Sequence, residues 1–166
     1  MEAFDVGMIL SSPELFLLMR IQNLAPPEEL PLPDDGAEEA FEGLEAAGLL
    51  IRDERHLAVD KAVAKMIKAV CQREWALTLE SIARSQTAFY GDGLCVTAER
   101  LGEQRWLITP FPSARNALNT MAAELADEQD PQRAQFAGAA QRFELTLPAQ
   151  EMRAFLEDAL TRTGEG

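Results

Sequence analysis

Few side chains in this sequence stand at the spacings that a catalytic or metal site requires. His56 is the only histidine. No partner at the spacing of a zinc site or a nucleophilic triad accompanies it, so we expect a solvent-exposed turn histidine. The acidic run from Asp34 to Glu39 lacks the twelve-residue loop of alternating oxygen ligands that calcium needs, and acids near a helix N-terminus explain it without a metal. We therefore predict neither a metal nor a cofactor.

The remaining reactive or phosphate-binding candidates also have simpler interpretations. Gly91-Asp92-Gly93 follows a strand but leads into another strand rather than a helix, which is not the pattern of a phosphate-binding loop. Cys71 and Cys95 are the only cysteines, and each fits a small core position. Because no nucleophile, base and orienting partner can be assembled from the sequence, we predict that the protein is not an enzyme.

The length and net charge of the chain disfavour further classes of function. The chain has 166 residues, 47% of them hydrophobic, with 28 acidic and 15 basic side chains and a net charge of −13. This length fits a single domain over residues 1–166. The negative charge disfavours binding to nucleic acids and to anionic membranes, because both require basic surface. No signal-peptide pattern or long apolar run is present, and we expect a cytoplasmic protein.

The elements that would position any site begin with a sheet-forming passage. From Arg73 to Leu125, short runs alternate apolar and polar residues between turn residues and then lead into a helix capped by Ser113. Alternation of this kind, with β-branched and aromatic residues, predicts an antiparallel meander. The passage carries five aromatic residues that either pack under helices or form a face for a partner: Trp75, Phe89, Tyr90, Trp106 and Phe111.

The N-terminal part, residues 1–72, is predicted to be mainly helical. Ser11 and Glu14 can form a capping box for an apolar helix over 14–24. A proline-rich strap over 25–36 follows, then an acidic helix ended by Gly48, a hairpin, and a helix over 60–72. The helix and hairpin have the outline of a winged helix. Because the helix is acidic, we expect no DNA binding, and one alternative is a regulatory protein derived from such a module.

The C-terminal part completes the predicted architecture. We expect residues 127–138 to form a mobile connection, and residues 139–160 to form a strand followed by a helix. Together with the meander and helix over 73–126, this predicts an α+β fold. Its sheet is an antiparallel meander of four to five strands packed with helices, with a winged-helix-like N-terminal part.

The order of these elements resembles the N-terminal half of the EspG family, cytosolic chaperones associated with ESX (type VII) secretion. The resemblance spans about Leu10 to Leu160. It rests on a helix end Leu44-Glu45-Ala46-Ala47-Gly48-Leu49, a link Leu57-Ala58-Val59-Asp60 and a strand Glu74-Trp75-Ala76-Leu77-Thr78-Leu79. It implies an α/β fold that holds a secreted helical protein in a soluble state, without catalytic residues. Members of the family continue into a second, similar half, whereas this sequence stops; dimerisation is one replacement for that half.

These observations favour a chaperone or adaptor whose partner is another protein, such as a small helical secreted protein. Loops at the ends of a rigid sheet commonly carry recognition. We therefore predict partner contacts at the turns near Asp92 and Gly102, with Tyr90, Leu101 and Trp106 beside them. Exposed strand edges are usually paired or protected, which makes a homodimer a reasonable arrangement.

Overall fold

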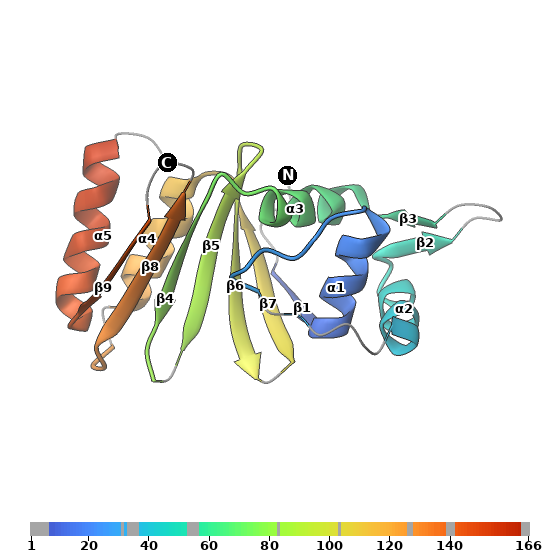
Figure 1. Cartoon of the computed structure of the whole chain (residues 1–166), viewed down its shortest axis with the longest axis horizontal. Helices are drawn as coiled ribbons and strands as arrows, with labels where there is room; N and C mark the ends of the chain where they lie inside the picture. Colours follow the sequence, from blue (N-terminus) through green and yellow to red (C-terminus); the bar gives the residue numbers. More distant parts are fainter. Residues whose placement is uncertain are drawn as a thin grey trace.

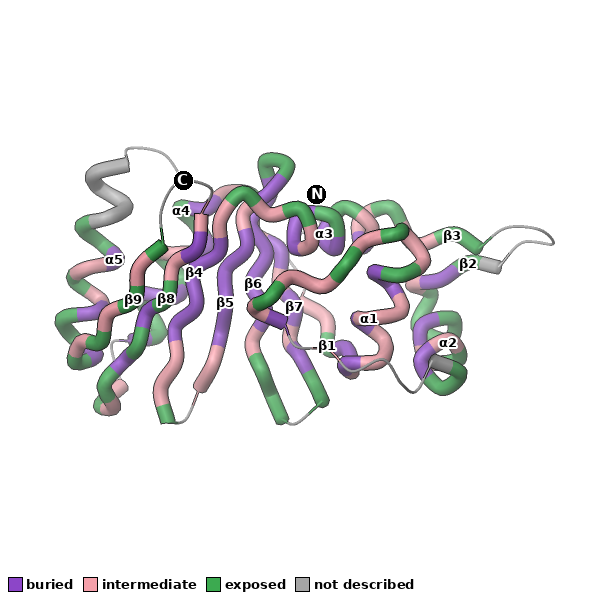
Figure 2. Tube along the Cα trace, in the orientation of Figure 1, coloured by how far each residue is buried: buried purple, intermediate pink, exposed green. Residues whose placement is uncertain are grey.

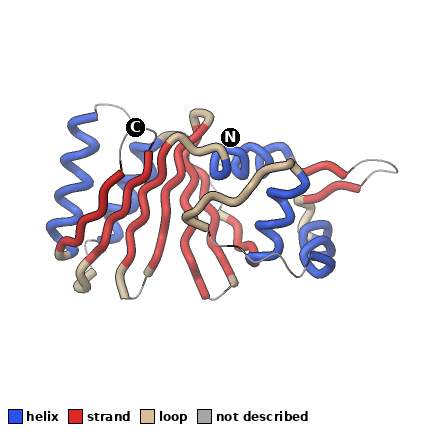
Figure 3. The backbone as a smooth tube through the Cα atoms, viewed as in Figure 1, coloured by secondary structure: helices blue, strands red, loops and turns tan. Residues whose placement is uncertain are grey.

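The computed structural model of the chain contains one antiparallel sheet of seven strands, with helices at both ends of the strand row (Figures 1 and 3). The structure describes residues 7–30, 32, 37–52, 57–82, 84–102, 104–125, 128–138 and 142–163. His56 and the segment Asp34 to Gly36 lie outside these residues. The α+β class predicted from the sequence is confirmed.

Neighbouring strands in the sheet are all antiparallel and follow the order β1-β7-β6-β5-β4-β8-β9. Their bounds are Met8–Ser11 (β1), Trp75–Glu80 (β4), Ser85–Gly91 (β5), Leu94–Gly102 (β6), Arg105–Phe111 (β7), Gln132–Gly138 (β8) and Arg142–Leu147 (β9). Strands β4 to β7 are joined as successive hairpins, as the alternating sequence predicts. β2 (Leu50–Arg52) and β3 (Leu57–Val59) form a separate hairpin. It projects outward at the end of the molecule opposite β9 (Figure 1).

The structure describes five helices, and three of them begin directly after a capping residue: Ser11, Asp60 or Ser113. Their bounds are Ser12–Ile21 (α1), Ala37–Ala46 (α2), Lys61–Cys71 (α3), Ala114–Glu124 (α4) and Ala149–Thr163 (α5). At α1, Ser11 accepts from the Glu14 amide at 3.2 Å, and the Glu14 carboxylate accepts from the Ser11 amide at 2.8 Å. This is the predicted capping box. Gly48, with a φ of 79°, ends α2 before the hairpin.

The two helix groups cover opposite faces of the sheet and are offset along it. Successive residues of a strand point to opposite faces. Phe89 and Val96 are buried with α1, α2 and α3, whereas their neighbours Ala88 and Cys95 are buried with α4 and α5. We call these sides the α1–α3 face and the α4–α5 face. Figure 2 shows β5 and β6, in the middle of the sheet, as its most continuously buried strands.

One row of paired residues on the α1–α3 face shows where the helical cover ends. From β1 across to β9 the row reads Met8, Ile108, Ala98, Thr87, Thr78, Gln135 and Glu144. The side chains under the helices are apolar, those in the middle are hydroxyls, and those on β8 and β9 are polar and exposed. The outer half of this face is therefore open and polar.

The sheet has more strands than the four or five expected, and the prediction of a mobile connection over 127–138 is wrong. Residues 132–138 form β8, which pairs on both sides, with β4 and with β9. Tertiary pairing overrides the weak strand preference of its sequence.

Of the helices that the structure describes, none combines the length and apolar character needed to cross a bilayer.

Candidate functional site

The structure does not gather the five predicted contact residues at one place. Tyr90 and Asp92 lie at the turn between β5 and β6, and Leu101 and Gly102 lie at the turn between β6 and β7. Because β6 runs the length of the sheet between these turns, the two pairs stand at opposite ends. Trp106 lies in the strand β7, with 6% of its surface exposed. The predicted residues therefore define two turns and one core position.

Trp106 is part of the core beneath α1. Its indole N–H donates a hydrogen bond of 3.0 Å to the Ser12 hydroxyl, and both residues are buried. This bond ties the first turn of α1 to β7 and satisfies the polar group of the ring. Little of the Trp106 ring is left to contact a partner.

Asp92 and Gly93 form the tight turn that joins β5 to β6. Both have positive φ, 54° and 74°, which is the backbone of a type I′ hairpin turn. Asp and Gly are favoured in this conformation, so the turn chemistry alone accounts for both residues. Tyr90 just before the turn is half-buried on the α4–α5 face.

Tyr90 belongs to a continuous row of aromatic rings that crosses the sheet. The centroids of Tyr90 and Trp75 lie 5.5 Å apart, those of Trp75 and Phe136 lie 5.9 Å apart, and those of Phe136 and Phe143 lie 5.3 Å apart. All three pairs are stacked. Phe155 of α5 then meets Phe143 edge-on at 6.2 Å. We call these five residues the aromatic row, and every one of them is half-buried.

Gly138 lies close against the aromatic row. A Cβ built on Gly138 would approach the Phe136 ring at 3.1 Å, so the ring occupies the space that a side chain there would fill. Gly138 also pairs with Trp75 across β4 and β8. The sequence pointed to Trp75 and Tyr90 but missed Phe136, Phe143 and Phe155, because those residues belong to β8, β9 and α5 and only the sheet order brings them alongside.

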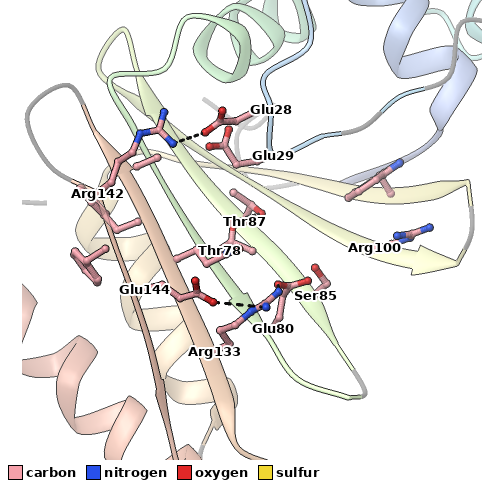
Figure 4. Close-up of a pocket in the computed structure, with 15 residues that line it drawn as sticks. Glu28, Glu29, Thr78, Glu80, Ser85, Thr87, Arg100, Arg133, Arg142 and Glu144 are labelled. Carbon is pink, nitrogen blue, oxygen red and sulfur yellow. Dashed lines mark hydrogen bonds and ion pairs between the residues drawn. The ribbon is translucent and has the colours of Figure 1, made fainter.

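A second feature is a polar hollow of about 710 Å³ on the open half of the α1–α3 face (Figure 4). Its floor includes Thr78 and Thr87, whose hydroxyls share a buried hydrogen bond of 2.9 Å. Charged side chains surround this floor and come from the strap before α2 and from β4, β6, β8 and β9: Glu28, Glu29, Glu80, Arg100, Arg133, Arg142 and Glu144.

Ion pairs hold the charged rim of the polar hollow together. Arg142 donates to Glu28 at 2.7 Å, and Arg73 makes two bonds to Glu29, of 2.9 and 2.7 Å. Arg133 pairs with both Glu80 and Glu144. The Arg142 guanidinium lowers the pKa of Glu28, and the Glu29 carboxylate raises the pKa of Arg73. Acids and bases thus neutralise each other here, which gives no bias toward a ligand of either charge.

Two turns, β4–β5 and β6–β7, lie at the end of the sheet opposite the Asp92 turn, and they expose aliphatic side chains. Ile82, at the β4–β5 turn, is 93% exposed, and Leu101, at the β6–β7 turn, is 45% exposed. Both line a shallow hollow of about 390 Å³ beside Arg84 and Arg100. Arg84 is held by Glu99 at 2.9 Å and by Glu124 at 3.2 Å. Isolated exposed aliphatic residues are common on protein surfaces.

Two observations concern the thiols and the possible metal ligands in the described part of the chain. Burial raises the pKa of Cys71 and of Cys95 to about 12, so both remain protonated at neutral pH. No group of three or more His, Cys, Asp or Glu side chains among the described residues is placed to hold a metal ion.

Comparisons with known proteins add no family to this description. Neither a scan against protein-family models nor a search of curated proteins gave a match. The fold and the site therefore define the chain only as an α+β protein with a seven-stranded antiparallel sheet, an aromatic row on one face and a polar hollow on the other.

Proposed function

We propose that this protein is a non-enzymatic, cytoplasmic chaperone or adaptor that binds another protein through the aromatic row. The observation that carries the proposal is the row itself. Five rings from four strands and one helix follow one another, four of them stacked and Phe155 edge-on, and all five are only half-buried. Aromatic side chains supply large contact area at low entropic cost and are enriched in the centres of protein interfaces.

The partner that this surface suits best is an amphipathic helix bearing apolar and basic side chains. Rings that are only partly covered can receive apolar side chains from a partner. The net charge of −13 attracts a basic partner and repels an acidic one. Glu151, Glu157 and Asp158 are exposed on α5, the helix in which the row ends, and add negative charge locally.

The resemblance to the EspG family supports the same class of function. It implies a cytosolic protein that keeps a small helical protein soluble before ESX secretion, which agrees with a helix as the bound element. Under this proposal the partner is such a secreted helical protein, and genes for a secretion ATPase and small helical proteins are expected near the gene for this chain.

The proposal is tested by measuring the affinity of ring variants for a partner. Helical proteins that co-purify from the source organism are made separately, and each is titrated against the purified chain. We expect Tyr90→Ala and Phe155→Ala to weaken binding at least about tenfold, because residues at interface centres commonly contribute that much. Phe16→Ala is the matched control, since Phe16 is a half-buried ring on α1, outside the row.

A spectroscopic measurement locates the contact independently. Trp75 and Trp106 are the only tryptophans, so in a Trp106→Phe background the fluorescence reports on Trp75 alone. A partner that covers the aromatic row shifts this emission to shorter wavelength. Unchanged emission on binding, together with full affinity of Tyr90→Ala and Phe155→Ala, would exclude the row as the binding surface.

A further inference from the structure

Helix α3 displays every lysine of the sequence on one exposed side. Lys61, Lys65 and Lys68 are all exposed, and their spacing of four and then three residues places them on the same face of the helix. The opposite side of α3 packs into the core through Val63 and Ile67. We call the three exposed residues the lysine stripe. None of them makes an ion pair with another residue in the described part of the chain.

Helix α2 carries a stripe of the opposite charge with the same spacing. Glu38, Glu42 and Glu45 are exposed, on the side of α2 that faces away from the buried Leu44. We call them the glutamate stripe. Two helices that lie side by side along these stripes can form three Glu–Lys pairs. Glu42 and Lys65 stand in the middle of the two stripes, so they meet whether the helices run parallel or antiparallel.

Both stripes are unfavourable within the helices that carry them. Each stripe repeats one charge at a spacing of four residues, which destabilises a helix. Lys61 also stands at the positive N-terminal end of α3, whose first turn contains no acidic residue, and Glu45 stands at the negative C-terminal end of α2, whose last turn contains no basic one. Natural sequences depart from such local rules mainly at functional sites. A surface of opposite charge that covers each stripe would remove this repulsion.

The β2–β3 hairpin joins the two stripes into one surface. It connects α2 to α3, and the Asp60 amide before α3 donates to the Leu49 carbonyl after α2 at 2.9 Å. Ile51 of the hairpin is 57% exposed and pairs with Ala58, which is also exposed. Exposed aliphatic residues next to charged helices match the composition of protein interfaces, which have an apolar centre and a polar rim. Figure 1 shows α2, α3 and the hairpin in the half of the molecule opposite β9.

We infer that this surface binds a second copy of the chain, with the glutamate stripe of one copy against the lysine stripe of the other. Because every copy carries both stripes, a two-fold axis allows the contact to be made twice. The net charge of −13 opposes association at long range, but salt screens exposed charges beyond about 8 Å, whereas the paired side chains are in contact. The surface is separate from the aromatic row and goes beyond the proposed function.

The test measures dimerisation of the full chain by sedimentation equilibrium, from micromolar to millimolar protein. We expect a dimer at low salt whose dissociation constant rises at high salt, because the ion pairs are at the surface. Lys65→Glu and Glu42→Lys should each raise the dissociation constant at least about tenfold, since each places like charges opposite one another in both contacts. Arg115→Glu and Glu151→Lys are the matched controls, because they make the same changes of charge at exposed positions of α4 and α5.

Charge reversal distinguishes lost pairing from lost folding. An equimolar mixture of the Lys65→Glu and Glu42→Lys variants should dimerise, because position 42 of each copy then meets an opposite charge at position 65 of the other. The double variant E42K/K65E should dimerise by itself, with an affinity close to that of the wild type. Variants that had simply unfolded would show neither rescue.

Three results would overturn the inference. The first is a chain that stays monomeric at millimolar concentration and low salt. The second is a dimer that Lys65→Glu and Arg115→Glu weaken equally, or that charge reversal does not restore. The third is a monomer whose Lys65→Glu variant loses affinity for the helical partner of the aromatic row, which would assign the lysine stripe to that partner. Tyr90→Ala should leave dimerisation unchanged, so a failure of this inference is distinguishable from a failure of the aromatic-row proposal.

Discussion

At the scale of single residues, Gly91 marks a close approach between the sheet and helix α3. A Cβ built on it would lie 2.7 Å from the Ala69 carbonyl oxygen and 3.1 Å from that of Gln72, both at the end of α3. Backbone atoms cannot rotate away as the end of a side chain can. A methyl group at this position therefore requires α3 or β5 to move.

We expect Gly91→Ala to lower the free energy of unfolding by about 1–3 kcal/mol, the usual cost of overpacking a well-packed site. Urea denaturation followed by circular dichroism measures the change. Gly102→Ala is the control, because nothing lies within 4 Å of the position of its Cβ and its φ is not positive. If the two variants proved equally stable, the close approach of β5 to α3 would be wrong.

Single residues also show why the sequence predicts only part of the candidate site. The alternation of the meander marks Trp75, Tyr90 and Trp106 as strand residues, but it does not say which face each one occupies relative to the helices. Trp106 points under α1 and Tyr90 points to the α4–α5 face. The face depends on which helices pack on which side, and that is a property of the whole chain.

At the scale of elements, the capped helices and the meander follow from local sequence, whereas β8 does not. Its residues, Gln132–Gly138, include no β-branched side chain and present alanines at two buried positions. Alanine and glutamine carry little strand preference. The strand exists because β4 and β9 pair with it on both sides, so its stability comes from residues distant in sequence.

The strap between α1 and α2 is a second element whose position depends on distant partners, and it carries a pH-dependent contact (Figure 4). Glu28 in the strap binds Arg142 of β9 at 2.7 Å, and this contact lowers the pKa of the carboxyl group. A pKa lower in the folded state stabilises the fold at pH values above the ordinary pKa of glutamate. That contribution is lost as the pH falls through the lowered value.

We expect NMR titration of the Glu28 carboxyl group to show a midpoint below that of a free glutamate. Arg142→Gln should move the midpoint back toward the ordinary value, because Arg142 is its largest cause. Arg105→Gln is the control, since Arg105 lies at the other side of the sheet, in β7. A Glu28 midpoint that Arg142→Gln leaves unchanged would contradict the ion pair.

At the scale of the whole molecule, one sheet separates two hydrophobic cores. Ile67 of α3 is fully buried in the core on one face, and Met152 of α5 is fully buried in the core on the other. The two cores share no residue. Because the helix groups are offset along the sheet, each face also keeps an uncovered half: the polar hollow on one and the surface around the exposed Ile9 on the other.

This arrangement predicts that stability changes in the two cores are independent. Ile67→Val should cost about 0.5–1.5 kcal/mol and Met152→Ala about 2–5 kcal/mol. Their double variant should equal the sum within about 0.5 kcal/mol, because the sheet lies between the sites and they share no neighbour. Chemical denaturation of the wild type, the two single variants and the double variant measures the free energies of unfolding that this comparison needs. As a comparison, Ile67→Val with Val70→Ala changes neighbours one turn apart on α3, where non-additivity is expected. Coupling across the sheet as large as coupling within α3 would show that the two cores behave as one.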